Sequence, residues 1–252
     1  MKTRILILTL LVTSLNLQGQ TDFPALKQQF LDYRKAKQQD SALYIAITMN
    51  QVALKEQSDT SYWYALSMGY QGNPYYSIKK VDTALYYWKK SIDLFEKYHF
   101  NHEDHGVGIN NLGKVYDHLK IKDSAVLYWD KYATLCENVD SLSIESYEIN
   151  YKLGMKYFQY KDYQKSLLRY KKSLHIKERL TPTIEEDIAD VFAKIGTVYF
   201  YDKKYDSSLI NYQKSYELRK KHKHTNKIEY FTSINRIGSA HMRLKNYDLS
   251  EN

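Results

Sequence analysis

The sequence is poor in residues that form disulfides and tight turns. Its 252 residues include one cysteine, Cys136, three prolines and nine glycines. One cysteine cannot form an internal disulfide, so the fold must depend on its core. We expect Cys136 itself to be a small, half-buried apolar residue. So few glycines and prolines argue against an all-β chain with many tight turns.

Long apolar runs are absent after the N-terminus. The first residues, MKTRILILTLLVTSLNLQGQ, place Lys2 and Arg4 before an apolar run that ends near Val12. This layout predicts a secretory signal peptide over 1–20, with no cysteine after it to carry a lipid anchor. The alternative is a cytoplasmic N-terminus that happens to be apolar. No later run approaches the roughly 18 apolar residues of a membrane helix, so we expect no span there.

Sequence patterns of catalysis are missing too. There is no nucleophile elbow, phosphate-binding loop, dinucleotide fingerprint or HExxH motif. We therefore expect no enzymatic activity and no cofactor. The composition, 43% hydrophobic and 26% charged with 26 tyrosines, favours a packed core in which tyrosine rings fill half-buried seams.

Two polar clusters have simple structural explanations. The segment YHFNHEDHG could bind a divalent ion, but a polar hinge between the second and third repeats, rich in capping residues, explains it better. The segment RKKHKHTNK, residues 219–227, could bind nucleic acid, but lysines at a helix end also favour the helix dipole. We expect neither a metal nor nucleic acid. The residues of the first cluster are His99, His102, Glu103, Asp104 and His105.

The most informative feature is an internal repeat. Glycines recur at spacings of 41, 42 and 42 residues. Each follows Leu or Ile, and each precedes an aromatic residue by three positions. Twelve positions after each glycine comes a small residue, and a large aromatic follows four later in the first three copies. The glycines are Gly113, Gly154, Gly196 and Gly238, and the residues before them are Leu112, Leu153, Ile195 and Ile237. The aromatic residues three positions later are Tyr116, Tyr157, Tyr199 and His241. The small residues are Ala125, Ser166, Ser208 and Ser250, and the large aromatic residues four after them are Trp129, Tyr170 and Tyr212.

Two weaker copies precede these. In YWYALSMGY, Ser67 is expected to take the glycine position, and Ala84 and Trp88 follow. The first copy keeps Tyr33 and Ala42, which are nine residues apart like Tyr116 and Ala125.

This pattern resembles the tetratricopeptide repeat (TPR), W-x2-L-G-x2-Y followed by A-x3-F. The resemblance implies an all-α solenoid of helical hairpins, stacked as a right-handed superhelix with a concave groove. It divides the chain into the signal peptide and a solenoid over 21–252. We expect repeats at 22–58, 59–101, 102–143, 144–183 and 184–226, and a sixth that begins at 227 and is truncated, as in a fragment of a longer protein.

The residues support helices independently of the family. Ile109, Leu112, Gly113 and Tyr116 fall on one helical face. We expect the repeat glycine to let the second helix of its hairpin approach closely. Acidic and hydroxyl residues just before the second helices are expected to be N-caps. These are Asp40 and Ser41, Asp82 and Thr83, Asp123 and Ser124, and Asp206 and Ser207.

The groove is the predicted binding site. Residues two before each glycine lie off the hairpin face and would form a largely cationic stripe. Aromatic and cationic residues nearby would complete a groove for an acidic or carboxylate-bearing peptide. The alternative is that these residues are simply the solvated face of the superhelix. The stripe is Asn111, Lys152, Lys194 and Arg236, and the added groove residues are Asn110, Lys114, Tyr151, Phe158, Phe200, Tyr201, Asn235 and Arg243.

The predicted function is a non-enzymatic scaffold that binds a protein or peptide. The chain is similar to exported TPR regions of bacterial sensor and regulator proteins, which implies the periplasmic, sensory part of a signalling protein. The alternative is a free-standing periplasmic adaptor without a signalling output. The sequence identifies neither the partner nor the oligomeric state.

Overall fold

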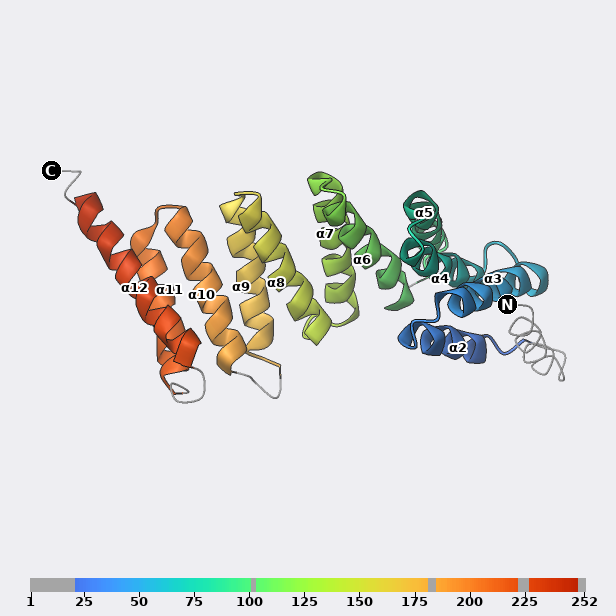
Figure 1. Cartoon of the computed structure of the whole chain (residues 1–252), viewed down its shortest axis with the longest axis horizontal. Coiled ribbons are helices and arrows are strands. Elements are labelled where there is room, and N and C mark those ends of the chain that lie inside the picture. The colour runs from blue at the N-terminus through green and yellow to red at the C-terminus, as the bar shows by residue number, and fades with distance from the viewer. Residues whose placement is uncertain (1–20, 101–102, 181–184, 222–226, 249–252) are drawn as a thin grey trace. The chain divides into compact units, whose positions relative to one another are not determined.

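A computed structural model describes residues 21–100, 103–180, 185–221 and 227–248. Within these ranges the chain forms eleven helices and no strand. The predicted signal peptide, His102 and Ser250 lie outside them. The helices are α2 Phe23–Lys35, α3 Gln39–Glu56, α4 Tyr62–Ser77, α5 Val81–Lys97, α6 Glu103–His118, α7 Lys122–Val139, α8 Ile144–Gln159, α9 Tyr163–Lys177, α10 Glu185–Tyr201, α11 Tyr205–Lys220 and α12 Lys227–Asp248 (Figure 1). No helix in the described ranges is both long and apolar enough for a membrane span.

The helices belong to two compact units. The first unit ends at Ile121 and contains α2 to α6, and the second begins at Lys122 and contains α7 to α12. The sequence predicts one continuous array over 21–252 and gives no sign of this division.

In the first unit each helix packs against the next along the chain. The core contains Phe30, Ile45, Met49 and Leu66, all nearly inaccessible to solvent. The ring of Phe30 stacks on that of Tyr70 at a centroid distance of 4.0 Å. Aromatic stacking therefore joins the first hairpin to the second.

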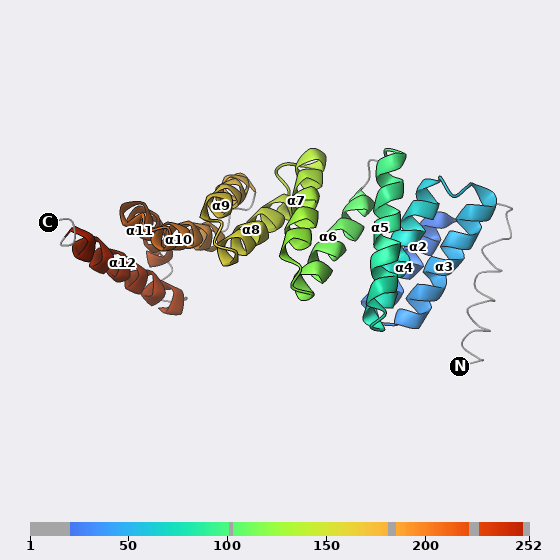
Figure 2. The same ribbon diagram turned by 90° about the horizontal axis from the view of Figure 1, so that it is seen from above.

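In the second unit successive helices from α7 to α12 also pack in chain order. Figure 2 shows α9 and α11 along one side of this unit, and α8, α10 and α12 along the other. Tyr170, Val191, Ile195 and Val198 form a buried cluster between α9 and α10. Each hairpin thus buries its apolar faces against its neighbours, as expected for stacked repeats.

The repeat glycines fit tightly against the second helix of their hairpins. A Cβ on Gly154 would lie 2.7 Å from Cδ1 of Tyr170, and one on Gly196 would lie 2.6 Å from Cδ1 of Tyr212. The small residue twelve positions later also has a role. The hydroxyl of Ser166 donates to the carbonyl oxygen of Gly154 at 2.8 Å, and Ser208 and Gly196 make the same bond. The close-packing role predicted for the glycines is confirmed in these two hairpins.

The glycine position of the second repeat was wrongly placed at Ser67. Gly72 occupies it, because a Cβ there would lie 2.3 Å from Nε1 of Trp88. Gly72 also precedes Ala84 by twelve residues and Gly113 by 41, the spacings of the other copies. Ser67 lies a turn and a half earlier and donates to the carbonyl oxygen of Tyr64.

The predicted N-caps of the second helices were also wrong. The helices begin earlier, with Gln38, Lys80 and Lys204 at the cap positions of α3, α5 and α11 and no capping side-chain hydrogen bond. The predicted aspartates lie inside the first turn, where a negative charge favours the helix dipole. They are Asp40, Asp82, Asp123 and Asp206.

The turn inside each hairpin has one recurring geometry. A lysine with positive φ follows the first helix of each hairpin. Successive lysines of this kind are 42, 41, 41 and 42 residues apart, which matches the repeat. In the α8–α9 turn, the N–H of Asp162 donates to the carbonyl of Tyr157, and that of Lys161 donates to the carbonyl of Phe158. These two bonds define a Schellman motif, in which the left-handed residue is usually glycine. The lysines are Lys37, Lys79, Lys120, Lys161 and Lys203.

Candidate functional site

The residues two before each glycine face the preceding hairpin. The Asn111 amide donates to Oδ1 of Asn73 on α4 at 2.7 Å. The Lys152 ammonium lies 4.0 Å from the ring centroid of Trp129 on α7. A residue opposite the hairpin face of a first helix meets the previous repeat in a stacked array. The predicted stripe therefore has internal partners at two of its four positions.

The other two stripe residues are half-buried. Lys194 lies on α10 and Arg236 on α12. One guanidinium nitrogen of Arg236 is buried and has no hydrogen-bond partner among the described residues.

The added groove residues are more accessible. Lys114 on α6, Tyr201 on α10, and Asn235 and Arg243 on α12 are exposed, whereas Asn110 on α6 is half-buried. These positions fall three before, one after, or five after the repeat glycine. They lie between the two buried faces of each first helix.

In the second unit the positions four and five after the glycine bring aromatic residues together. Phe158 on α8 and Tyr201 on α10 meet edge to face at a centroid distance of 5.3 Å. Phe200 packs against Tyr201 at 5.9 Å, and Tyr201 remains 59% exposed. Six predicted groove residues on the first helices of this unit are called the first-helix face below, namely Tyr151, Phe158, Lys194, Tyr201, Asn235 and Arg243. Its exposed aromatic edge can contact an apolar side chain of another molecule.

Tyr151 has a second partner on the next hairpin. Its hydroxyl donates to the carboxylate of Asp190 on α10. Burial and this neighbouring carboxylate raise the pKa of Tyr151. The pair links α8 to α10, and the sequence reasoning missed Asp190.

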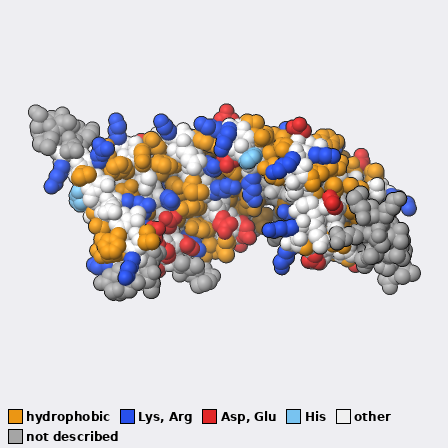
Figure 3. Space-filling model, viewed as in Figure 1, with side chains coloured by type: hydrophobic (Ala, Val, Ile, Leu, Met, Phe, Trp, Pro, Cys, Tyr) orange, Lys and Arg blue, Asp and Glu red, His pale blue; other side chains and the backbone are white. Residues whose placement is uncertain are grey.

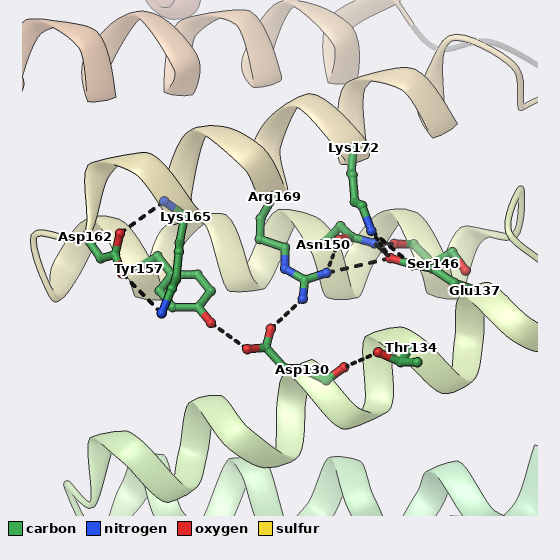
Figure 4. Close-up of polar contacts among 10 residues, drawn as sticks. All are labelled: Asp130, Thr134, Glu137, Ser146, Asn150, Tyr157, Asp162, Lys165, Arg169 and Lys172. Atoms are coloured by element: carbon green, nitrogen blue, oxygen red, sulfur yellow. Dashed lines mark hydrogen bonds and ion pairs between the residues drawn. The ribbon is translucent and has the colours of Figure 1, made fainter.

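A polar network joins three helices of the same unit. Figure 4 shows the Arg169 guanidinium of α9 between Asp130 of α7 and Asn150 of α8. It donates to Oδ1 of Asp130 at 2.6 Å and to Oδ1 of Asn150 at 3.0 Å. Tyr157 donates to the other oxygen of Asp130 at 2.5 Å, and burial together with this bond raises the tyrosine pKa. These paired groups tie α7, α8 and α9 together.

The first residue of the basic segment 219–227, Arg219, is buried and paired with carboxylates. Arg219 is 2% exposed. Its guanidinium lies 3.1 Å from Glu186, 3.2 Å from Glu229 and 3.5 Å from Asp190. Residues 222–226 lie outside the described ranges.

The histidine cluster has structural partners where it is described. Asp104 accepts from Lys27 at 2.5 Å and from Tyr62 at 2.6 Å, and His105 stacks on Phe95 at 5.1 Å. The described ranges contain no group of three ligating residues suited to a metal ion. Cys136 is buried, and burial raises the pKa of its thiol.

The surface also carries hydrophobic side chains over α12, as Figure 3 shows. Ile228, Phe231 and Met242 are 79%, 58% and 66% exposed. Met242 follows the repeat glycine by four positions, like Phe158 and Phe200 in the preceding repeats.

Solved structures share this arrangement of helices. A putative kinesin light chain with TPR-like repeats from Podosopora anserina aligns with a TM-score of 0.61 and 11% identity, covering 80% of this chain and 97% of its own. BtubC from P. vanneervenii gives 0.56 and 13%, covering 80% and 91%. MamA protein gives 0.54 and 17%, covering 81% and 95%. No family model matches the sequence, and no curated protein does. The likeness shows the fold, and the predicted TPR-like all-α solenoid is confirmed.

Proposed function

We propose that the chain is a non-enzymatic scaffold that binds a protein or peptide segment on the first-helix face of its second unit. The observation that carries the proposal is the contact between Phe158 and Tyr201. Two successive repeats there present one exposed aromatic surface, and Tyr201 is 59% exposed. Rigid aromatic rings at a surface supply contact area with little loss of conformational entropy.

The chemistry of the face favours a segment with an apolar side chain and a carboxylate. The apolar side chain would contact the Phe158–Tyr201 edge. The carboxylate would pair with Lys194 or Arg243, which lie on α10 and α12. Charge-assisted hydrogen bonds to a carboxylate are about twice as strong as neutral ones.

The test is a pull-down from bacterial envelope extract with the purified chain as bait. Replacing Tyr201 with Ala and Arg243 with Glu should reduce recovery of the bound protein at least about tenfold, because about 2 kcal/mol or more is lost at a central aromatic contact. Both residues are exposed, so the helicity should not change. Replacing Lys152 with Glu is a poor test of binding, because the Lys152 ammonium packs on the ring of Trp129 and its loss would also disturb that packing.

The matched control is Tyr86→Ala. Tyr86 is 58% exposed and lies on α5 in the other unit. The Tyr86→Ala variant should leave recovery of the bound protein unchanged. Equal recovery with the Tyr201/Arg243 variant and the wild type would refute the first-helix face as the binding surface.

We also propose that this scaffold is exported and serves as the sensory part of a bacterial signalling protein, with the free-standing adaptor as the alternative. The support is the layout of residues 1–20 and the resemblance of the repeats to exported regulators. Residues 1–30 fused to an alkaline phosphatase that lacks its own signal should give active enzyme, which requires export. An inactive fusion that is nevertheless produced would contradict export.

A further inference from the structure

An exposed apolar residue recurs on the second helices. Fourteen residues after the repeat glycine, the second unit places Leu127 on α7, Leu168 on α9 and Ile210 on α11. Their exposed fractions are 63%, 56% and 53%. Packing within the hairpins does not require apolar residues there, because the buried positions of these helices are already filled. The three residues are called the outer stripe, and Tyr86 occupies the same position after Gly72 in the first unit.

Charged residues flank this stripe in a fixed order. Residues four before and four after an apolar position lie about one turn away on the same helical face. An aspartate precedes Leu127 and Ile210, and Gln164 precedes Leu168. A lysine follows all three. The preceding aspartates are Asp123 and Asp206, the following lysines are Lys131, Lys172 and Lys214, and Tyr86 has Asp82 and Lys90 at the same distances.

The surface is hollowed beside the middle of the stripe. A hollow of about 560 Å³ lies between α7 and α9, with Leu168, His175 and Ile176 in its wall. Glu137 and Lys172 also line it, and they pair with each other at 3.0 Å. The hollow gives an apolar side chain from another molecule room to enter next to Leu168.

We propose that the outer stripe is the interface between two copies of this chain. The stripe has an acidic row on one side and a lysine row on the other. A two-fold axis along the stripe places the apolar residues of two copies face to face and turns the second helices antiparallel. Asp206 of one copy then faces Lys214 of the other, and Lys214 faces Asp206. A single surface can thus satisfy both partners, as an isologous dimer requires.

A second copy fits this surface better than a partner of one charge. An acidic peptide would match the lysine row and meet the aspartate row with like charge, and a basic peptide would do the reverse. Like charges placed opposite each other suppress a wrong partner. This interface uses the second helices α7, α9 and α11, whereas the first-helix face uses the first helices α8, α10 and α12.

The test is sedimentation of the full chain from about 1 μM to about 1 mM, a range that covers weak dimers. We expect the wild type to form dimers as concentration rises. Leu168→Lys should weaken the dimer at least about tenfold, because two buried ammonium groups would meet across the axis. Leu54→Lys is the control, because Leu54 is 54% exposed on α3 and lies outside the stripe.

Charge reversals at one repeat identify the arrangement. Asp206→Lys alone or Lys214→Asp alone should weaken the dimer about tenfold, since each places two like-charged pairs in contact. The double reversal should restore association to within about threefold of the wild type, because both rows are exchanged together. A chain that is monomeric throughout, or a dimer that Leu168→Lys leaves unchanged, would overturn the interface. A double variant whose dimer is as weak as the dimers of the single variants would also overturn the interface.

Discussion

At the scale of single residues, two glycines of the same repeat position have different surroundings. Gly154 is covered by the ring of Tyr170 at 2.7 Å from a Cβ position. No atom of the described residues lies within 4 Å of the corresponding position on Gly238. Substitutions at Gly154 and Gly238 can therefore be compared to measure the packing role of the repeat glycine.

Gly154→Ala is expected to destabilise the protein by up to about 2 kcal/mol. The buried Tyr170 ring must move, and such overpacking costs about 1–3 kcal/mol, which exceeds the roughly 1 kcal/mol that alanine gains over glycine in a helix. Urea denaturation followed by far-UV circular dichroism would measure the change.

Gly238→Ala is the matched control and should have the opposite sign. With open space around its Cβ it should stabilise the helix by up to about 1 kcal/mol. A loss of stability at position 238, or a gain at position 154, would contradict the packing argument.

At the scale of elements, the hairpin turns are built without glycine. Lys161 has a φ of 63° in the turn between α8 and α9. A residue with a Cβ costs about 1–2 kcal/mol more than glycine in this conformation. The scarcity of glycine in the sequence thus leaves some strain in each turn.

Lys161→Gly is expected to stabilise the protein by up to about 1 kcal/mol. The relief of this strain exceeds the added chain entropy of glycine, which is roughly 0.5–1 kcal/mol. Lys171→Gly is the comparison, because Lys171 is exposed within α9 and should lose about 1 kcal/mol there. Thermal melts of both variants would show shifts of opposite sign, and two shifts of the same sign would contradict this explanation.

At the scale of the whole molecule, buried tyrosines are a shared property of both units. Burial raises the pKa of eight of them, and the pKa of Tyr147, which also lies near Asp187, reaches about 12. Carboxylates hydrogen-bonded to Tyr62, Tyr151 and Tyr157 add to the effect. The eight are Tyr62, Tyr70, Tyr87, Tyr132, Tyr147, Tyr151, Tyr157 and Tyr170.

We expect the protein to lose stability steadily above about pH 10. The unfolded tyrosine pKa is about 10, and the folded values are higher. Below pH 10 both states hold the proton and stability is unaffected. Above it the unfolded chain releases protons that the folded chain keeps, so the free energy of unfolding falls as pH rises.

Tyrosinate absorbance at 295 nm and circular dichroism, recorded together, would test this. Part of the 26 tyrosines should ionise only as the helices unfold, and a titration in urea should show a single transition near pH 10. If all tyrosines ionise near pH 10 while the helices stay intact, the prediction is wrong.

The helical hairpins and their packing could be predicted because their causes are local and periodic. Leu153, Gly154 and Tyr157 fall on one face of one helix, and Ser166 and Tyr170 do so on the next. The placement of Ser67 failed because one motif match was followed in preference to the constant distance between Gly72 and Ala84. The helix starts failed because aspartate is favourable both at a cap and in the first turn.

The sequence by itself determined the fold class, the period and the close packing of Gly154 and Gly196 against the second helices of their hairpins. All three depend on spacing along the chain, which a fixed helical geometry converts into faces. Only the tertiary structure decided the surroundings of the faces. It placed Lys152 against Trp129, buried Arg219 among three carboxylates, and left Leu127, Leu168 and Ile210 exposed. Those outcomes depend on contacts between different repeats, which no helical periodicity within one repeat specifies.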